Sequence, residues 1–161
     1  MLVGIVSDTH VGTRIARLPQ DVPAALAGVD LILHAGDLVD PRVLRELRNV
    51  APVVAVAGNC DHGHLPEKTV VQAGNHVIGL VHRPPRVLGE DALKALFGEP
   101  VACVVCGHTH RSAVERHSRV LLLNPGSPVF PLDGVRSIAL LAVGEQLVPQ
   151  IVALGTRHTG D

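Results

Sequence analysis

Four short polar motifs each follow a run of aliphatic residues, and this pairing most strongly limits what the chain can fold into. The motifs are Asp8-Thr9-His10, Gly36-Asp37, Gly58-Asn59-Cys60-Asp61 and Gly107-His108-Thr109-His110. A short aliphatic run such as Leu2–Val6 is typical of a buried parallel strand. In open α/β sheets the ligand-binding loops follow the carboxyl ends of such strands. We therefore expect an α/β fold that brings the four motifs together.

The remaining pattern predicts two sheets in one domain, residues 1–155, followed by a flexible tail, residues 156–161. Strands are expected at residues 2–6, 30–34, 52–57, 68–73, 76–81 and 101–105, and helices at 21–28, from Asp40-Pro41 onward, and at 90–97. The last strands, at residues 113–117, 120–123, 135–143 and 147–153, are expected to form one antiparallel set. One sheet would be mostly parallel and the other mixed or antiparallel. The two would pack face to face with helices outside.

The polar motifs supply a set of candidate metal ligands, completed by His82 at the end of a predicted hairpin strand. The seven ligands are Asp8, His10, Asp37, Asn59, His82, His108 and His110. We predict two adjacent sites that share Asp37. The first takes Asp8, His10, Asp37 and His110, and the second takes Asp37, Asn59, His82 and His108. Mixed imidazole and carboxylate donors favour Mn²⁺, with Ni²⁺, Fe²⁺ or Zn²⁺ as alternatives, over Mg²⁺ or Ca²⁺.

Two adjacent divalent cations indicate metal-assisted hydrolysis of a phosphoester, with a hydroxide that bridges the metals as the nucleophile. Asp37 would bridge the metals, while Asn59 and His108 would face the phosphate and stabilise its developing charge. Arg83 and Arg111 could bind substrate phosphate together with Asn59, although solvated arginines are an equal alternative.

The group that protonates the leaving oxygen is left open by the sequence. His62, His64 and His10 are candidates, whereas a Cys60 thiol is a weak donor. His34 is expected to orient a ligand or to pack, and Asp61 to hold a loop or a ligand His. Cys103 and Cys106 lie three apart in a strand, so they point to opposite faces, and we expect them to be buried apolar residues.

These motifs resemble the calcineurin-like metallophosphoesterases, whose signature is D-x-H, G-D, G-N-x-[ED], H and G-H-x-H in this order. The short chain and the Gly-Asn-Cys-Asp block resemble the small, single-domain YfcE-like phosphodiesterase branch, as does Asn124-Pro125-Gly126-Ser127. The resemblance covers residues 1–145. It implies a four-layer αββα sandwich of two mixed β-sheets flanked by helices, and a divalent-metal phosphodiesterase acting on small organic phosphodiesters.

Two positions depart from the family pattern. Many members have His where Cys60 stands, and the missing imidazole implies slow turnover and a preference for good leaving groups. His82 is followed by Arg83-Pro84-Pro85-Arg86, where the family usually has Gly, so this loop would be stiffer and more basic. The family also contains a retromer subunit. A catalytically weak metal-binding scaffold or protein-interaction module is therefore the alternative function.

Composition excludes several partners. The formal net charge is −1, and the chain has two Phe, no Tyr and no Trp, which argues against a nucleic-acid partner. The sequence has no apolar run near the roughly 18 residues of a membrane span and no signal segment. With three cysteines as well, we expect a cytoplasmic protein. Residues 129–132 could support a homo-oligomer, which the sequence leaves open.

Overall fold

The computed structural model describes residues 1–155, so the predicted tail at 156–161 lies outside the described residues. The helices are α1 (Asp21–Ala25), α2 (Arg42–Arg48) and α3 (Glu90–Phe97). The strands are β1 (Leu2–Val6), β2 (Leu31–His34), β3 (Val53–Ala55), β4 (Lys68–Ala73), β5 (His76–Val81), β6 (Cys103–Val105), β7 (Ser112–His117), β8 (Val120–Pro125), β9 (Ser137–Val143) and β10 (Leu147–Ala153).

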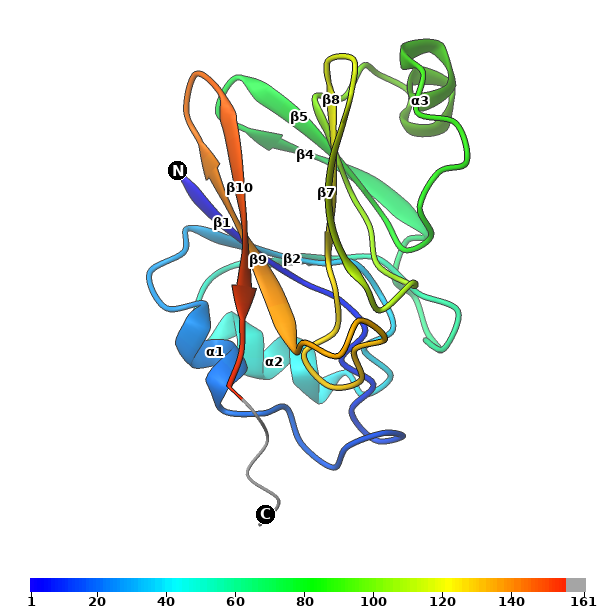
Figure 1. Ribbon diagram of the computed structural model, residues 1–161. Helices are drawn as coiled ribbons and strands as arrows, with labels where there is room; N and C mark the ends of the chain where they lie inside the picture. Colours follow the sequence, from blue (N-terminus) through cyan, green and yellow to red (C-terminus); the bar gives the residue numbers. More distant parts are fainter. Residues whose placement is uncertain (156–161) are drawn as a thin grey trace.

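Two five-stranded sheets pack against each other, with helices on the two outer faces (Figure 1). The order is β10-β9-β1-β2-β3 in the first sheet and β4-β5-β6-β8-β7 in the second. Helices α1 and α2 cover the first sheet, and α3 covers the second. This is the four-layer αββα arrangement implied by the resemblance.

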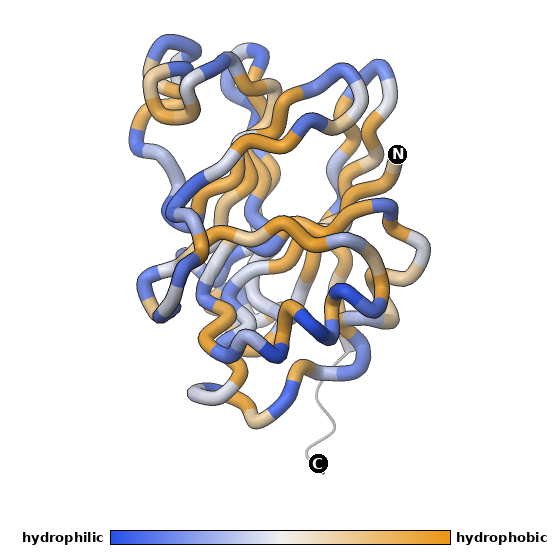
Figure 2. The backbone as a smooth tube through the Cα atoms, turned by 180° about the vertical axis from the view of Figure 1, so that it is seen from behind, coloured by the Kyte–Doolittle hydropathy of each residue, from blue (hydrophilic) through white to orange (hydrophobic). Residues whose placement is uncertain are grey.

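The aliphatic runs are continuous because the strands are buried on both faces. In β1, Ile5 belongs to the cluster between the sheets, whereas Val6 packs in the cluster beneath α1 and α2. In β6, Val105 faces the other sheet and Val104 faces α3. Figure 2 shows hydrophobic residues concentrated along the strands and hydrophilic ones in many of the turns. Within residues 1–155, no helix is long and apolar enough to cross a membrane.

Both sheets are mixed, so the prediction that one would be mostly parallel was wrong. The first contains the parallel set β1-β2-β3 and the antiparallel strands β9 and β10. The second contains the parallel set β5-β6-β8, with β4 and β7 antiparallel at its edges. The last four strands also do not form one antiparallel set. They divide into two pairs that join different sheets, because β8 pairs in parallel with β6 while β9 pairs with β1.

Most predicted elements occur, with differences at their ends. The hairpin strands β4 and β5 and the helix α3 have the predicted bounds, and α3 ends at Gly98 in the left-handed conformation, φ 86°. Helix α1 ends at Ala25 and not at Gly28. Pro23 contributes no amide hydrogen bond to so short a helix, and the chain reverses at Gly28, φ 83°.

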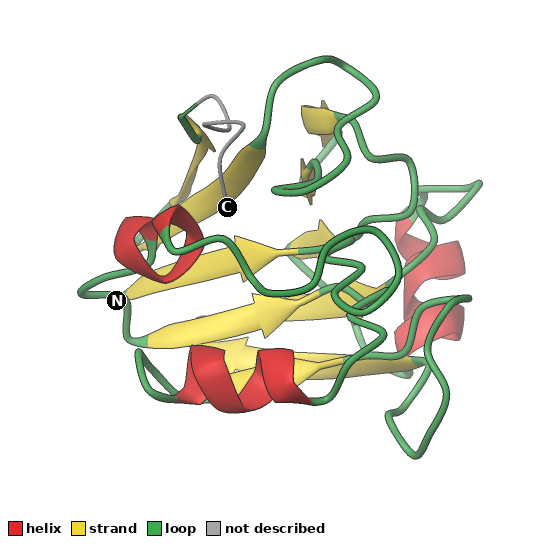
Figure 3. Ribbon diagram, turned by 90° about the horizontal axis from the view of Figure 1, so that it is seen from below, coloured by secondary structure: helices red, strands yellow, loops and turns green. Residues whose placement is uncertain are grey.

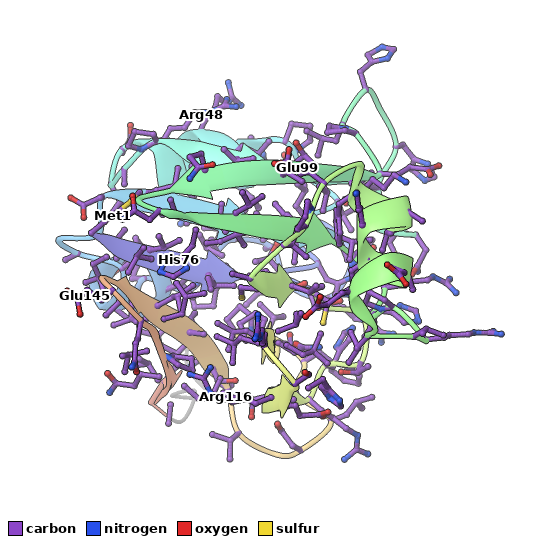
Figure 4. The ribbon with its side chains drawn as sticks, turned by 90° about the horizontal axis from the view of Figure 1, so that it is seen from above. Met1, Arg48, His76, Glu99, Arg116 and Glu145 are labelled. Carbon is purple, nitrogen blue, oxygen red and sulfur yellow. The ribbon has the colours of Figure 1, made fainter. Side chains whose placement is uncertain are left out.

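The two sheets are also joined at the end that carries the N-terminus. The His76 ring of β5 lies 3.1 Å from the carbonyl oxygen of Gly144, which follows β9 in the other sheet. The Met1 ammonium group donates a hydrogen bond of 3.2 Å to the Val143 carbonyl within the first sheet. Met1, His76 and Glu145 lie toward this end of the molecule in Figure 4. The loops that carry the predicted ligands leave the carboxyl ends of β1, β2, β3, β5 and β6, at the opposite end of the molecule. That end is therefore available for a binding site.

Candidate metal centre

The loops that follow five strands converge at one end of the two sheets. In Figure 3 several strand arrowheads point to the side where most of the long loops gather. Backbone hydrogen bonds connect the loops: the amide of Asp8 donates to Gly36 O at 3.0 Å, and that of His10 to Asp37 O at 3.0 Å. The amide of Gly107 donates to His82 O at 2.8 Å. These bonds join residues 25 to 28 positions apart, and His10 and His110, 100 positions apart, meet at the same place.

Asp8, His10 and His110 form the first group of donors. Their ligand atoms lie within 4.8 Å of one another. The two imidazole rings are stacked with centroids 5.0 Å apart, and their Nε2 atoms face each other at 3.2 Å. Asp8 Oδ1 is 3.3 Å from His110 Nε2. These residues are three of the four ligands predicted for the first site, and the fourth, Asp37, lies beside them.

Asp37 and His82 form the centre of the second group. Asp37 Oδ2 is 3.5 Å from His82 Nε2 and 3.6 Å from His10 Nε2. His82 Nε2 also lies 3.2 Å from Asn59 Oδ1. One carboxylate oxygen therefore faces imidazoles from both predicted sites, which is the position that the shared ligand requires.

The His108 side chain makes fewer close contacts within the centre than those of the other six predicted ligands. Its ring centroid is 5.2 Å from that of His82, and its backbone amide donates to Asp8 Oδ2 at 3.0 Å. Burial lowers the pKa of His108, and the charges of His82 and Arg83 act in the same direction. The exposed Arg83 therefore lies near this end of the centre. Arg111 is exposed, and its amide donates to Thr109 Oγ1 at 3.3 Å.

The candidate proton donors occupy different places. His62 and His64 line a cleft of about 370 Å³ with Leu38, Leu44 and other residues of the neighbouring loops. His10 lies inside the centre itself. Cys60 lies at the centre, because its sulfur is within 4.8 Å of the ligand atoms of His10 and Asp37.

The tautomers of two histidines follow from their outer hydrogen bonds. Nδ1 of His82 lies 2.7 Å from Ala35 O, and Nδ1 of His110 lies 2.7 Å from Phe130 O. A carbonyl only accepts, so Nδ1 carries the proton in both rings, and in the neutral ring Nε2 presents its lone pair to the centre. Second partners of this kind are usual for histidines that bind metals.

The donor set fits a cation. Within residues 1–155, Asp8 Oδ1 is a buried side-chain oxygen without a hydrogen-bond partner. Lone pairs of Asp8 Oδ1 and His110 Nε2 lie 3.3 Å apart in the same small space, which is unfavourable unless a positive charge lies between them. The Asp8 carboxylate, outweighing burial, raises the pKa of His110. The residues present therefore suit a divalent metal, as the sequence predicted.

The backbone of the centre is strained. Asp8, His10, Asp37, His108 and His110 all have a left-handed backbone, with φ between 45° and 68°. This conformation is uncommon for residues other than glycine and costs roughly 1–3 kcal/mol each. Such strain clusters at ligand-binding positions, where the surrounding structure holds it in place.

Asp61 holds the loops of the second group, as predicted. Its Oδ2 accepts hydrogen bonds from the amides of Asp37 and Gly58, both at 2.8 Å, and its Oδ1 accepts one from Val39 at 2.7 Å. Cys60 completes the connection, because its amide donates to Asp37 Oδ1 at 2.8 Å. These bonds position Asp37 Oδ2 between the two imidazoles.

The Asn124-Pro125-Gly126-Ser127 motif supports the first group. The Ser127 hydroxyl donates to Asp8 O at 2.8 Å, and the Asn124 side chain donates to Gly107 O at 2.9 Å. The motif thus ties the loop after β1 to the loop after β6. The sequence marked this turn only through the family resemblance and predicted no contact for it.

His34 contacts the loops after β1 and β2, in agreement with its predicted orienting role. It is fully buried, its Nδ1 accepts a hydrogen bond from the Gly36 amide at 3.2 Å, and its Nε2 lies 3.2 Å from Thr9 Oγ1. Since Nδ1 accepts, the proton is on Nε2, which donates to Thr9. Thr9 stands between the predicted ligands Asp8 and His10.

Removing His34 is expected to change how stability depends on pH. Burial lowers the pKa of His34 from 6.5 to about 4. Between these values the unfolded chain binds a proton that the folded chain does not, so stability is lost as pH falls from 6.5 to 4. The loss amounts to about 3 kcal/mol. Urea unfolding followed by circular dichroism should show a smaller pH effect in His34→Gln.

Exposed His117 provides the matched control for this prediction. His117→Gln should keep the acid-induced loss of stability seen in the wild-type protein. If His34→Gln kept the full loss too, protonation of His34 would not be its cause.

Two residues near the centre were not predicted from the sequence. The Arg14 amide donates to His10 O at 2.9 Å, and its guanidinium lies 4.7 Å from the ring centroid of Phe130. Phe130 in turn contacts the His110 ring, with centroids 6.0 Å apart. The spacing of Arg14 four residues after His10 was the available signal, whereas no local pattern connects Phe130 to the centre.

Comparison with known proteins shows the family of the chain. Residues 1–146 match the model of the calcineurin-like phosphoesterase superfamily domain. A probable metallophosphoesterase of Methanocaldococcus jannaschii is 38% identical over 157 residues, covering 96% of this chain and 82% of that protein. An archaeal phosphodiesterase structure has a TM-score of 0.75 and 25% identity, over 96% of this chain and all (100%) of that one.

Vps29 of Entamoeba histolytica, solved in complex with Zn²⁺, has a TM-score of 0.74 and 26% identity, over 95% of this chain and 99% of that chain. The family match over residues 1–146 includes all seven predicted ligands. The chain therefore belongs to the calcineurin-like phosphoesterase superfamily.

Proposed function

We propose that the chain is a divalent-metal-dependent phosphodiesterase that hydrolyses small organic phosphodiesters at a site for two cations. The observation that carries this proposal is the position of Asp37, whose Oδ2 lies 3.6 Å from His10 Nε2 and 3.5 Å from His82 Nε2. Burial alone would raise the pKa of Asp37. The neighbouring His82 imidazole and the hydrogen bond from the Cys60 amide outweigh burial and hold its pKa well below the ordinary range. Asp37 is thus charged and can serve two cations.

The seven predicted ligands would hold the cations in the two sets given by the sequence. Asp8, His10, Asp37 and His110 would hold one, and Asp37, Asn59, His82 and His108 the other, with Mn²⁺ as the expected metal. Bound divalent cations would supply a hydroxide nucleophile at neutral pH and neutralise charge on the phosphate. Family membership and the similarity to an archaeal phosphodiesterase support this reaction class.

The chain's own residues would bind and orient the phosphate. Asn59 is exposed, and its neutral amide adds no negative charge where an anionic phosphate must bind. His108 is partly buried next to the His82 ring, which Asn59 also contacts, and the charge of Arg83 acts on it, so both His108 and Arg83 can contact phosphate oxygens. Arg111, exposed after the Gly107–His110 loop, is the second proposed arginine. Asp37, Asn59 and His108 are the proposed catalytic residues.

Cys60 is a poor candidate for protonating the leaving group. Burial raises the pKa of the Cys60 thiol above its ordinary value, and the Asp37 carboxylate raises it further. A thiol that holds its proton this tightly donates it weakly. We therefore propose that turnover is faster for esters with stable leaving groups, such as nitrophenolate, than for alkyl esters.

The first test is hydrolysis of bis-p-nitrophenyl phosphate by metal-stripped protein that is re-supplied separately with Mn²⁺, Ni²⁺, Zn²⁺ and Mg²⁺. Mn²⁺ is expected to restore turnover by about 100-fold or more over the stripped protein, because the metals supply several kcal/mol of charge stabilisation. Mg²⁺ should restore less, since the donor set contains four imidazoles. A protein-free Mn²⁺ blank is the control.

The second candidate function is a metal-binding protein-interaction module, which the structural similarity to Vps29 favours. It predicts a different result in the same assay. If two metal ions bind per chain but none of the four metals restores hydrolysis, the phosphodiesterase proposal fails and the module is supported. A cytoplasmic location and self-association remain predictions from the sequence.

A further inference from the structure

Phe130 is 44% exposed at the edge of the candidate metal centre. The chain has only two Phe, no Tyr and no Trp. The other, Phe97, lies over Gly79 and packs against the apolar cluster beneath α3. One of the two phenylalanine rings therefore faces solvent, and it does so beside predicted metal ligands.

The backbone of Phe130 is held firmly while its ring stays accessible. The Phe130 amide donates to Ser127 Oγ at 2.9 Å, and its carbonyl accepts from His110 Nδ1 at 2.7 Å. The Phe130 and His110 rings meet at 86°. In Figure 1 the loop between β8 and β9, which carries Phe130, lies beside the blue loop that follows β1. The ring is therefore fixed relative to the first group of donors.

Arg14 brings a positive charge to the same place. Its guanidinium lies 4.7 Å from the Phe130 ring centroid, within the range of a cation–π contact. The Arg14 amide is bonded to the carbonyl of His10, so the side chain begins one helical turn from a predicted ligand. A guanidinium can pair with a phosphate oxygen and also stack on a flat ring.

We infer that Arg14 and Phe130 form a subsite for an aromatic group, an aryl ring or a nucleobase, esterified to the substrate phosphate. This inference rests on the proposed function. A phosphate that binds to a cation held by Asp8, His10 and His110 can place its ester group at the rim, because Phe130 contacts His110 and Arg14 is bonded to His10. The flat group would stack on this pair, and the guanidinium would neutralise phosphate charge. The preferred substrates are then aryl or nucleoside phosphodiesters and not simple alkyl diesters.

Binding, measured separately from turnover, tests the subsite. The probes are phenyl phosphate and methyl phosphate, which share the phosphate and differ in the ring, titrated by calorimetry into the Mn²⁺-loaded protein. The wild-type protein should bind phenyl phosphate about tenfold more tightly, as stacking on one aromatic residue allows. Phe130→Leu should reduce this ratio to about twofold or less and leave methyl phosphate binding unchanged. Phe130→Tyr should retain the ratio.

Further variants distinguish stacking from a structural role. Arg14→Gln should weaken the binding of both phosphates, because it removes a charge. Leu132→Ala changes an apolar side chain on the same loop that is 53% exposed, and it should keep the wild-type ratio.

An unchanged ratio in Phe130→Leu, or equal affinities in the wild-type protein, would overturn the subsite. If bis-p-nitrophenyl phosphate is still hydrolysed in that case, the proposed function stands without it. If the wild-type protein binds neither phosphate, the subsite fails, and if it also leaves bis-p-nitrophenyl phosphate unhydrolysed, the proposed function fails with it.

Discussion

Asp37→Ala is expected to lower kcat for bis-p-nitrophenyl phosphate by about 1,000-fold or more at saturating Mn²⁺. Its Oδ2 faces both His10 and His82, so its loss removes the shared negative charge of the centre. Both cations would then be bound more weakly, which metal analysis of the dialysed protein would show as fewer ions per chain.

Two other variants make this result interpretable. Asp37→Asn keeps the shape of the side chain and the oxygen that accepts from the Cys60 amide. Asn also tolerates the left-handed backbone at this position, φ 56°, so the variant should fold and still lose activity. Asp91→Ala removes a carboxylate from an exposed position on α3 and should keep the wild-type rate. If both Asp37 variants kept wild-type rates, the assignment of the site would be wrong.

Gly36→Ala is expected to reduce the free energy of unfolding by about 3 kcal/mol or more. A Cβ at this position would lie 2.7 Å from Gly58 N and 2.8 Å from His82 Nδ1. Both neighbours are held by hydrogen bonds, to Asp61 and Ala35 respectively. The methyl group must therefore displace the loops after β2, β3 and β5, and hydrolysis should be lost as well.

Gly28→Ala is the matched control for this substitution. The two glycines have similar backbone angles, φ 91° at Gly36 and 83° at Gly28, but a Cβ at Gly28 meets nothing within 4 Å. It should cost only the backbone strain, about 1 kcal/mol. The chain has no Trp or Tyr, so urea unfolding is best followed by far-ultraviolet circular dichroism. Equal losses in the two variants would show that close packing around Gly36 does not matter.

Local patterns in the sequence predicted most of the elements. Aliphatic runs marked β1 and β2, the Gly74-Asn75 turn marked the hairpin of β4 and β5, and Gly98 marked the end of α3. These signals are local, because strand and helix periodicity and turn conformation depend on residues close together in the chain. The same locality explains the errors: β8 and β9 both look like antiparallel strands, and nothing nearby indicates that they enter different sheets.

The sequence by itself determined which donors follow which strands, and hence that Asp8, Asp37 and His82 could meet. Only the tertiary structure decided their mutual geometry: Asp37 Oδ2 lies between two imidazoles, Asp61 accepts from three amides, and Asp8 Oδ1 has no hydrogen-bond partner among residues 1–155. Likewise, the pairing of Arg14 with Phe130, across 116 positions, has no trace in the local pattern. Contacts of this kind depend on sheet order and on packing between layers, which bring together residues whose separation in sequence carries no periodic signal.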